Sequence, residues 1–594
     1  MAVTDTGSKT LAELVLSAAA AHGGTALRYP DGDTWLELSY PQLGADVRAI
    51  AKGLIALGID TGDRVGILSN TRAEWTLADF GAICATAVVV PVYQTNAAEE
   101  CQHVLDHSGT KAIFCEDASQ VAKIDEVRAD LPDLRHVICF EGRSEGAITL
   151  DELRERGVDV SDEDLAERVA AVAPGDVATI VYTSGTTGPP KGCMLTHANV
   201  RAVIDMVQQR LEFAPGDDVV YVFLPLAHML ARAVQVLGIA FGVQLVYWRR
   251  DPDLIIADVA EINPTHLPSI PRIFEKIYAA ATGKAEAAGG AKAKLFWWAV
   301  GVGKEVRGRE RRGGQAGPIL KAQLALADRL VLHKVRALFG NRAKLAITGA
   351  APIDEDIVAF FHAAGVWVLE GYGMTETTVA ATLNTIEENR PGTVGKALPG
   401  CDVQIAEDGE ILMRGPNIFL GYYRDDEATR EILRDGWLSS GDLGELDDDG
   451  YLRITGRKKD LIITSSGKNI SPSNIESAIT QSRWISQAVV YGDRRQYLVA
   501  LVTLDPDERA ALAEQAGADP DDSALHEHAG VRAEIQRAID DANRRFARIA
   551  QIKKFAILDR VLSQEHEELT PTMKVKRNIV YERHGDVFDA LYDD

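Results

Sequence analysis

Cysteine is scarce in this chain, with six residues in 594. None forms a CxxC pair, and two of them lie within the apolar runs GAICATAVVV and HVICF. This spacing excludes a disulfide framework and argues against a cysteine metal site. We expect reduced and mostly buried thiols in a cytoplasmic protein. The six positions are Cys84, Cys101, Cys115, Cys139, Cys193 and Cys401.

Long apolar runs are also missing. The first ten residues, MAVTDTGSKT, contain no apolar segment, so we expect no signal peptide. The longest apolar stretch covers residues 233–248 and contains two glutamines. It is shorter than the ~20 residues that a membrane-spanning helix needs, and we interpret it as part of a core.

Positive charge is in deficit, because 63 Lys and Arg face 87 Asp and Glu and leave a net charge of −24. Such acidity argues against sequence-independent nucleic-acid binding, which needs a basic face to displace counterions. It leaves room for an enzyme that binds anions in a local pocket. The 46% of apolar and 25% of charged residues are typical of a globular protein and exclude disorder and collagen.

The order of patterns along the chain predicts two domains. Residues 1–175 alternate helical periodicity with short apolar runs, which indicates an α/β parallel sheet. From about residue 395, Asp-Gly turns between short alternating segments predict β-hairpins. The polar segment RKKD follows Gly456, and α/β alternation then resumes. We therefore expect a large domain at 1–456 and a small one at 457–594.

Residues 281–317 differ in composition from the rest, being rich in Gly, Ala, Lys and Arg. The favoured interpretation is a mobile, solvated surface insertion. The alternative is a weak membrane-surface element at 296–312, since an aromatic cluster adjoins a basic run there. Its residues are Phe296, Trp297, Trp298, Arg307, Arg309, Arg311 and Arg312.

The strongest local feature is TSGTTGPPKG, which starts at Thr183 after the apolar run ATIVY. Gly185 and Gly188 leave the backbone N–H groups open to phosphate oxygens, and Lys191 supplies a positive charge. Four hydroxyls, those of Thr183, Ser184, Thr186 and Thr187, add further donors. The spacing differs from the Walker A motif, in which a Lys directly follows the second Gly. We interpret the segment as a phosphate-binding loop of another kind.

This loop resembles the signature of the adenylate-forming (AMP-binding) superfamily, and further motifs follow in that family's order over nearly the whole chain. They are LPLAHMLAR from Leu224, TGAAP from Thr348, GYGMTE from Gly371, SSGD from Ser439, GRKKD from Gly456 and PTMKVKR from Pro571.

The resemblance implies an α/β and α+β fold with a large N-terminal domain of two α/β sheet subdomains and a small β-barrel-like subdomain. A small, mobile α+β domain would follow. It also implies a two-step reaction, in which a carboxylate joins the α-phosphate of ATP, with release of pyrophosphate, and a thiol such as that of CoA then takes the acyl group. ATP, Mg²⁺ and CoA are the expected cofactor and substrates.

For the first step, the resemblance assigns Thr375 to the α-phosphate and Glu376 to Mg²⁺, a hard cation that prefers carboxylate and phosphate oxygens. It assigns Asp442 to the ribose hydroxyls and Arg457 to the ribose or a phosphate. Tyr372 would stack on adenine. Gly349, Ala350 and Gly373 would also border the nucleotide.

For the moving domain, the resemblance assigns Lys574 to the carboxylate oxygen and α-phosphate, with the hinge at Lys459. Relatives carry Gly immediately before this lysine, whereas this chain has Met573. Ser466 and Gly467 would meet the pantetheine arm of CoA after the domain rotates. His228 would lie near the carboxylate and the pantetheine tunnel.

The acid is expected to be apolar, because the segments 224–232 and 265–273 contain no Asp that could pair with an amino-acid ammonium. Residues 268–278 and 338–352 resemble those of long-chain fatty acyl-CoA synthetases. The alternatives are a ligase that delivers the acyl group to a carrier protein, a CoA ligase for another apolar acid, a peptide-synthetase adenylation domain and an inactive ligand-binding homologue. The short remainder after Lys574 argues against the modular synthetase, and the retained polar residues argue against the inactive homologue.

Overall fold

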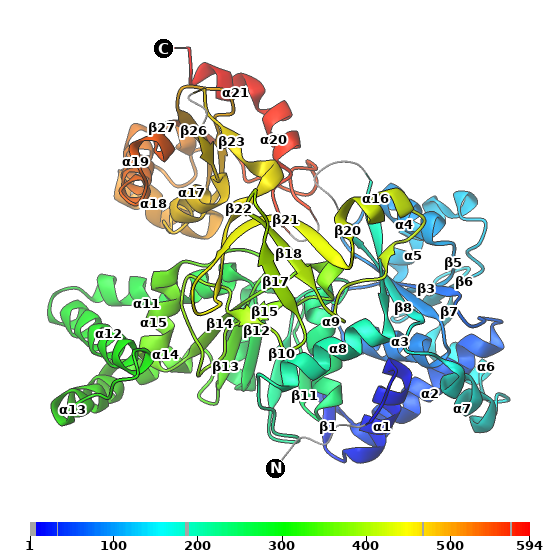
Figure 1. Cartoon of the computed structure of the whole chain (residues 1–594). Helices are drawn as coiled ribbons and strands as arrows, with labels where there is room; N and C mark the ends of the chain where they lie inside the picture. Colours follow the sequence, from blue (N-terminus) through cyan, green and yellow to red (C-terminus); the bar gives the residue numbers. More distant parts are fainter. Residues whose placement is uncertain (1–6, 33, 184–188, 466–467, 571–572, 594) are drawn as a thin grey trace.

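The structure is a computed structural model that describes residues 7–32, 34–183, 189–465, 468–570 and 573–593. A large mixed α/β domain makes up the body, and a smaller domain at the C-terminus lies against one side of it (Figure 1). The fold class expected from the sequence is confirmed in its parts, which are two α/β sheets, a small β-rich unit and a C-terminal α+β unit.

The first sheet of the body has eight strands in the described residues, in the order β19-β9-β8-β4-β3-β5-β6-β7. Strands β3 to β8 run parallel, while β9 and β19 are antiparallel to their neighbours. The parallel strands are β3 (Arg64–Leu68), β4 (Val88–Val92), β5 (Thr110–Cys115), β6 (His136–Cys139), β7 (Ile148–Thr149) and β8 (Val177–Thr183); β9 (Lys191–Thr196) and β19 (Gly421–Tyr422) complete the sheet.

The second sheet has nine strands in the described residues, in the order β16-β15-β14-β13-β12-β10-β11-β1-β2. Two of the motifs that the sequence singled out begin at the ends of its parallel central strands. TGAAP begins at the last residue of β13, and GYGMTE begins within the last two residues of β14. The strands are β1 (Thr25–Asp31), β2 (Thr34–Ser39), β10 (Val219–Val222), β11 (Gln244–Tyr247), β12 (His266–Ser269), β13 (Leu345–Thr348), β14 (Trp367–Tyr372), β15 (Thr382–Leu383) and β16 (Lys396–Ala397).

One large core joins the two sheets. Apolar side chains of Val65 and Val181 from the first sheet, and of Leu245 from the second, belong to the same buried cluster. Helices α1 (Leu11–Ala21), α2 (Tyr40–Ala56), α3 (Ala73–Cys84), α8 (His197–Gln208) and α9 (Met229–Ala240) contribute to it. Helices α6 (Leu150–Arg156) and α7 (Asp162–Ala171) also contribute to this core, whereas α4 (Ala98–Ser108) and α5 (Ala118–Glu126) pack in a separate cluster with the first sheet.

A second core lies on the other face of the nine-stranded sheet, under an aromatic cluster around Phe274 and Phe361. The helices that cover this face are α10 (Ile255–Ile262), α11 (Pro271–Ala288), α12 (Gly290–Arg311), α13 (Pro318–Ala327), α14 (His333–Ala337) and α15 (Glu355–Ala364).

The β-rich unit comprises β17 (Asp402–Ile405), β18 (Glu410–Arg414), β20 (Leu433–Arg434), β21 (Trp437–Leu446) and β22 (Leu452–Arg457). Helix α16 (Asp426–Ile432) lies between β18 and β20 in the chain. The two predicted Asp-Gly hairpins are confirmed, since β17 pairs with β18 and β21 with β22. Asp442 lies in β21, and Arg457 is the last residue of β22, directly before the C-terminal unit.

The C-terminal unit begins with the short pair β23 (Ile462–Ile463) and β24 (Asn469–Ile470). Its sheet of β25 (Ile485–Tyr491), β26 (Leu498–Leu504) and β27 (Ile552–Leu558) packs against α17 (Pro472–Ile479), α18 (Arg509–Ala516) and α19 (Ala529–Asn543) on one face. Helices α20 (Arg577–Arg583) and α21 (Gly585–Ala590) cover the other face.

The insertion expected at 281–317 lies at the surface, and it is helical with one buried stripe. Most of these residues form the end of α11 and all 22 residues of α12. Ala299, Val302 and Val306 lie on one buried stripe, and Gly303 passes so close to α15 that a Cβ there would lie 2.4 Å from the carbonyl oxygen of Ala363. Glycine lowers helix propensity, but this stripe and the helix-forming Ala, Lys, Arg and Glu outweigh the glycines.

All six cysteine thiols are unpaired and buried, as the sequence indicated. Residues 233–248 form α9, β11 and the turn between them, within the core. Among the described residues, no helix combines the length and the apolar character that crossing a membrane would require.

Candidate active site

The loop after β14 brings three predicted residues to the carboxyl edge of the nine-stranded sheet. Tyr372 ends the strand, and Thr375 and Glu376 lie in a single helical turn, η4 (Thr375–Thr377). Thr375 and Glu376 are buried. A Cβ on Gly373 would lie 2.1 Å from the carbonyl oxygen of Val379, so only glycine fits this turn. Ligands of open α/β sheets bind outside this edge.

Glu376 is held by a residue that the sequence did not reveal. The hydroxyl of Tyr422 in β19 donates to Glu376 Oε1 at 2.7 Å, and the N–H of Phe419 donates to the carbonyl oxygen of Glu376 at 2.9 Å. Among the described residues, no three metal-ligating side chains gather at one point. A single carboxylate nevertheless suits Mg²⁺ that arrives with ATP, since this ion is commonly bound by one or two carboxylates together with phosphates and water.

Asp442 connects the β-rich unit to β14. It lies within β21, and not in a turn, and its carboxylate accepts from both Tyr372 Oη and Arg457 Nε at 2.8 Å. Burial, with the Asp442 charge second, raises the pKa of Tyr372 well above its usual value, so the phenol remains a donor. Three residues predicted separately from Gly371–Glu376, Ser439–Asp442 and Gly456–Asp460 thus form one hydrogen-bonded group.

The predicted phosphate loop connects β8 to β9, two antiparallel strands in which Thr183 pairs with Lys191. Lys191 Nζ lies 3.7 Å from a carboxylate oxygen of Asp425 and 5.3 Å from the centre of the Tyr422 ring. The positions of Ser184, Gly185, Thr186, Thr187 and Gly188 lie outside the described residues. The two ends of the loop therefore place Lys191 beside the tyrosine that contacts Glu376.

The TGAAP segment continues β13 at the same edge of the sheet. Ala350 has a φ of 68°, a left-handed conformation that is uncommon for a non-glycine residue, and it follows directly on Gly349. Such backbone outliers concentrate at ligand sites. The buried hydroxyl of Thr348 has no hydrogen-bond partner in the described part of the chain.

His228 caps the N-terminus of α9, where its Nδ1 accepts from the N–H of Leu230 at 3.2 Å. Burial lowers the pKa of His228 to about 4, and the charge of Lys574 adds to this effect. Lys574 is exposed to solvent along its side chain, yet desolvation of its ammonium, ahead of repulsion by Arg457, lowers its pKa. The charges of Asp442 and Glu376 act on the pKa of Lys574 in the opposite direction.

Arg232, four residues after His228, makes a contact that the sequence did not predict. Its guanidinium is buried and donates to both carboxylate oxygens of Asp79 in α3 and to Thr179 Oγ1 in β8, the strand that enters the phosphate loop. Gln235 Nε2 donates to the same carboxylate at 2.9 Å. This network connects the helix of His228 to the strand of Thr183.

The predicted hinge residue Lys459 lies in η5 (Lys458–Asp460), directly after β22. Desolvation, followed by repulsion from Arg457, lowers the pKa of Lys459. Its neighbour Lys458 is paired with Asp408 and Glu410 of the β17–β18 hairpin at 2.6 and 3.0 Å. The predicted CoA contacts Ser466 and Gly467 lie outside the described residues.

Ion pairs fix the C-terminal unit against the body on the side of α11. Arg272 pairs with Asp505, and Lys276 Nζ lies 2.7 Å from Asp507. Asp354 accepts from Gln481 at 2.6 Å and from Arg545 at 2.9 Å. In this arrangement the charge of Lys574 acts on His228, and those of Asp442 and Glu376 act on Lys574.

Two α/β sheets in one domain, a β-rich connector and a C-terminal α+β unit are the arrangement of the adenylate-forming class of enzymes. Comparison with known proteins agrees. Residues 16–423 match the family described as AMP-binding enzyme, and residues 459–594 match the AMP-binding enzyme C-terminal domain. The chain belongs to the AMP-binding enzyme family.

Among curated relatives, the long-chain-fatty-acid–CoA ligase FadD15 of Mycobacterium bovis is 38% identical, over 95% of this chain and 94% of its own length. The long-chain-fatty-acid–CoA ligase ACSBG2 of Xenopus laevis is 33% identical, over 96% and 82%. Among solved structures, the adenylation domain of a carboxylate reductase from Mycobacterium chelonae matches with a TM-score of 0.76 at 20% identity, covering all of this chain and 92% of that one.

Proposed function

We propose that this protein is a long-chain fatty acid–CoA ligase that forms acyl-CoA through an acyl-adenylate. The observation that carries the proposal is the 38% identity with the mycobacterial ligase, which extends over both domains. The presence of Glu376, Asp442, Arg457 and Lys574 together supports it, because inactive homologues have no need to keep all four; Arg457 donates to Asp442, and the charges of Asp442 and Glu376 act on Lys574.

In the first half-reaction, a carboxylate oxygen of the fatty acid attacks the α-phosphorus of ATP. The bond from that phosphorus to the bridging oxygen breaks, and pyrophosphate leaves. Two anions must approach each other, so catalysis consists of charge neutralisation and alignment. Lys574 would bind the attacking oxygen and the α-phosphate, Thr375 would donate to that phosphate, and Lys191 with the loop from Thr183 would hold the β- and γ-phosphates.

The nucleoside of ATP would bind beside these residues. Asp442 would accept from the ribose hydroxyls, with Arg457 oriented beside it, and Tyr372 would lie against adenine with Gly349, Ala350 and Gly373. Glu376 would hold Mg²⁺, which when bound neutralises phosphate charge.

In the second half-reaction, the CoA sulfur attacks the acyl carbon, the bond to the phosphate oxygen breaks, and AMP leaves. We propose that the domains divide at 456/457 and that the second domain turns about Lys459 after adenylation, which withdraws Lys574 and brings Ser466 and Gly467 to the pantetheine arm. His228, which burial keeps neutral, would lie beside the carbonyl carbon.

The location in the cell is part of the proposal. The buried, unpaired thiols support a cytoplasmic enzyme. Peripheral contact with the inner face of the membrane would occur through residues 296–312.

The identity of acid and acceptor is tested by one coupled assay, in which AMP release is measured with ATP, palmitate and CoA. Acetate and benzoate replace palmitate in the controls, and an acyl carrier protein replaces CoA. We expect palmitate with CoA to give the highest kcat/KM. Transfer to the carrier protein alone would indicate a fatty acyl-AMP ligase, and a preference for benzoate would indicate a CoA ligase for another apolar acid.

A further inference from the structure

Two histidines of α4 lie beside the β8–β9 hairpin that carries the predicted phosphate loop. His103 and His107 are four residues apart, so both side chains lie on the same face of the helix. Their rings stack with centroids 5.8 Å apart, and both residues are half-buried. Neither residue lies within a motif that predicted the site. Their contacts nevertheless lead to both ends of the loop.

His103 contacts the end of the loop. Its Nε2 lies 3.3 Å from the carbonyl oxygen of Pro190, the residue directly before Lys191. A carbonyl oxygen can only accept, so Nε2 carries the proton and donates. His103 thereby holds the backbone from which the Lys191 side chain extends.

His107 contacts the strand that enters the loop. Its Nδ1 lies 2.7 Å from the hydroxyl oxygen of Tyr182, the residue directly before Thr183. Burial raises the pKa of the Tyr182 phenol, so the phenol stays protonated. Desolvation, followed by repulsion from His103 and Arg424, lowers the pKa of His107. The phenol therefore donates to a neutral imidazole.

The segment around β19 is connected to the same helix. Arg424 donates from Nη1 to the carbonyl oxygen of His107 at 3.0 Å, and the ring of Tyr423 meets the His107 ring edge-on with centroids 5.8 Å apart. The residue before Tyr423 is Tyr422, whose hydroxyl donates to Glu376. Helix α4 thus contacts both ends of the loop and the segment that holds Glu376.

A metal site is another use of two histidines one helical turn apart. Here His103 Nε2 donates its proton to Pro190, and the lone pair of His107 Nδ1 accepts from Tyr182, so both nitrogens are engaged. Among the described residues, no group of three metal-ligating side chains includes them. The contacts favour an anchor for the loop.

We propose that His103 and His107 are positioning residues that hold the two ends of the phosphate loop, and with them Lys191, in place for the β- and γ-phosphates of ATP. The inference rests on the proposed function, because it takes Lys191 as the residue that meets those phosphates. Neither imidazole needs to touch the nucleotide. A hydrogen bond between neutral groups is worth about twofold to tenfold in a binding constant.

Calorimetric binding of MgATP and of AMP to the full chain tests the proposal, because AMP lacks the two phosphates that Lys191 would hold. His103→Ala and His107→Ala should each weaken ATP binding by about twofold to tenfold and leave AMP binding unchanged. His103→Gln replaces the donor Nε2 with an amide nitrogen, and His107→Asn replaces the acceptor Nδ1 with an amide oxygen. Both should retain most of the ATP affinity. The measurement needs neither fatty acid nor CoA, so failure of the ligase activity in the coupled assay is a separate result.

His136→Ala is the matched control. The Nε2 of His136 also lies near a backbone carbonyl oxygen, that of Leu57 at 3.1 Å, and its strand β6 is four strands away from β8 in the same sheet. This variant loses a contact of the same kind and should leave both affinities unchanged.

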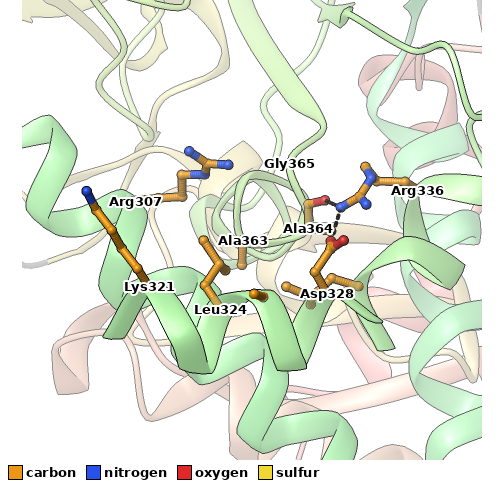
Figure 2. A pocket seen from close by; sticks show the side chains of 10 residues that line it. Arg307, Lys321, Leu324, Asp328, Arg336, Ala363, Ala364 and Gly365 are labelled. Atoms are coloured by element: carbon orange, nitrogen blue, oxygen red, sulfur yellow. Dashed lines mark hydrogen bonds and ion pairs between the residues drawn. The ribbon is translucent and has the colours of Figure 1, made fainter. Parts of the chain in front are cut away.

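A second control tests for a general effect of charge. Lys321→Gln removes a cation from a groove of about 280 Å³ between α13 and the end of α15 (Figure 2). Figure 1 shows α13 and α4 on opposite sides of the body. ATP affinity should not change in this variant.

Thermal unfolding verifies that each variant is folded. If His103→Ala does not fold, His103→Asn takes its place, since its amide ends short of Pro190. Unchanged ATP affinity in both alanine variants, or an equal loss of ATP and AMP affinity, would overturn the proposal. So would an equal loss of ATP affinity in the His136 or the Lys321 variant.

Discussion

The positive charge of Lys574 in the C-terminal unit acts on His228 in the first domain and, after the larger effect of burial, lowers the pKa of the imidazole. One side chain belongs to the C-terminal unit and the other caps a helix in the middle of the first domain. The charges of Asp442 and Glu376, both in the first domain, act on Lys574 in turn. We propose that this is the arrangement of the adenylation step.

Replacing Lys574 should therefore separate the half-reactions. Lys574→Ala removes one charge from the transition state of adenylation, and ATP–pyrophosphate exchange should fall by about 10²–10³-fold. Thioester formation from supplied acyl-adenylate and CoA should change by less than about threefold, since the lysine has left the site by then. Lys576→Ala, two residues away, is the control for both assays. An equal loss in the two half-reactions would disprove the division of labour.

The ion pair between Asp442 and Arg457 leads us to expect that the affinity for ATP depends on the charge of Asp442. Asp442→Asn keeps the shape of the side chain but removes the charge that Arg457 and Tyr372 contact, and hydrogen bonds to a charged group contribute about 1.5–3 kcal/mol. Calorimetric ATP affinity should fall about tenfold to a hundredfold. Asp449→Asn, in an exposed turn where the carboxylate pairs with Arg390, should leave affinity unaltered. Undiminished ATP binding by the Asp442 variant would remove this residue from the nucleotide site.

The sequence motifs were sufficient to predict Glu376, Asp442 and Arg457, because each of these residues has a fixed position within its own motif. Glu376 follows β14 directly, and Asp442 and Arg457 belong to paired strands, so their neighbourhood follows once the strands are recognised. Their partners could not be predicted in the same way. Tyr422 is 46 residues from Glu376, and Asp79 is 153 residues from Arg232, so both contacts depend on how the sheets pack.

The helix α12 illustrates the opposite case, in which composition misled. Three glycines and a basic run between residues 301 and 312 favoured a mobile, solvated insertion, whereas tertiary contact with α15 makes a glycine favourable at position 303. A glycine that lowers intrinsic helix propensity can thus be the residue that allows two helices to approach.

The ion pair between Arg272 and Asp505 connects the two domains. We expect that breaking it changes the rate of one half-reaction relative to the other. Asp505→Arg places two like charges at the contact with Arg272 and should disfavour the closed arrangement. Adenylation should then slow by roughly threefold to tenfold, the scale of a partly buried ion pair, while thioester formation is maintained or accelerated. The charge swap Asp505→Arg/Arg272→Asp should restore adenylation. A double variant as slow as the single one would show that the pair does not hold the domains.

The buried carboxyl group of Glu370 leads us to expect that its contribution to the free energy of unfolding depends on pH. The side chain is buried two residues before Tyr372, accepts from the N–H of Gly392, and burial raises its pKa to about 8. Since the pKa is higher in the folded state than in the unfolded state, this group stabilises the fold fully below about pH 4.5, and the contribution is lost as the pH rises to about 8.

Glu370→Gln keeps a neutral acceptor and should raise the free energy of unfolding by roughly 2–4 kcal/mol at pH 8, with little change at pH 5. Urea unfolding at the two pH values measures the difference. Glu407→Gln, at an exposed position, should show no such dependence. A gain of equal size at both pH values would mean that protonation of Glu370 is not the cause.

The buried pair Arg232–Asp79 supplies the last prediction, because it connects the helix of His228 to the strand that enters the phosphate loop. Arg232→Met leaves the Asp79 carboxylate buried without its cation and should lower the free energy of unfolding by about 3–5 kcal/mol. Arg232→Met/Asp79→Leu removes both charges and should recover most of that loss. If the pair also positions the loop, the stable double variant will still show a raised KM for ATP with kcat nearly unchanged. A double variant with normal KM would limit the network to stability, since Thr179 would then hold β8 in place without the guanidinium.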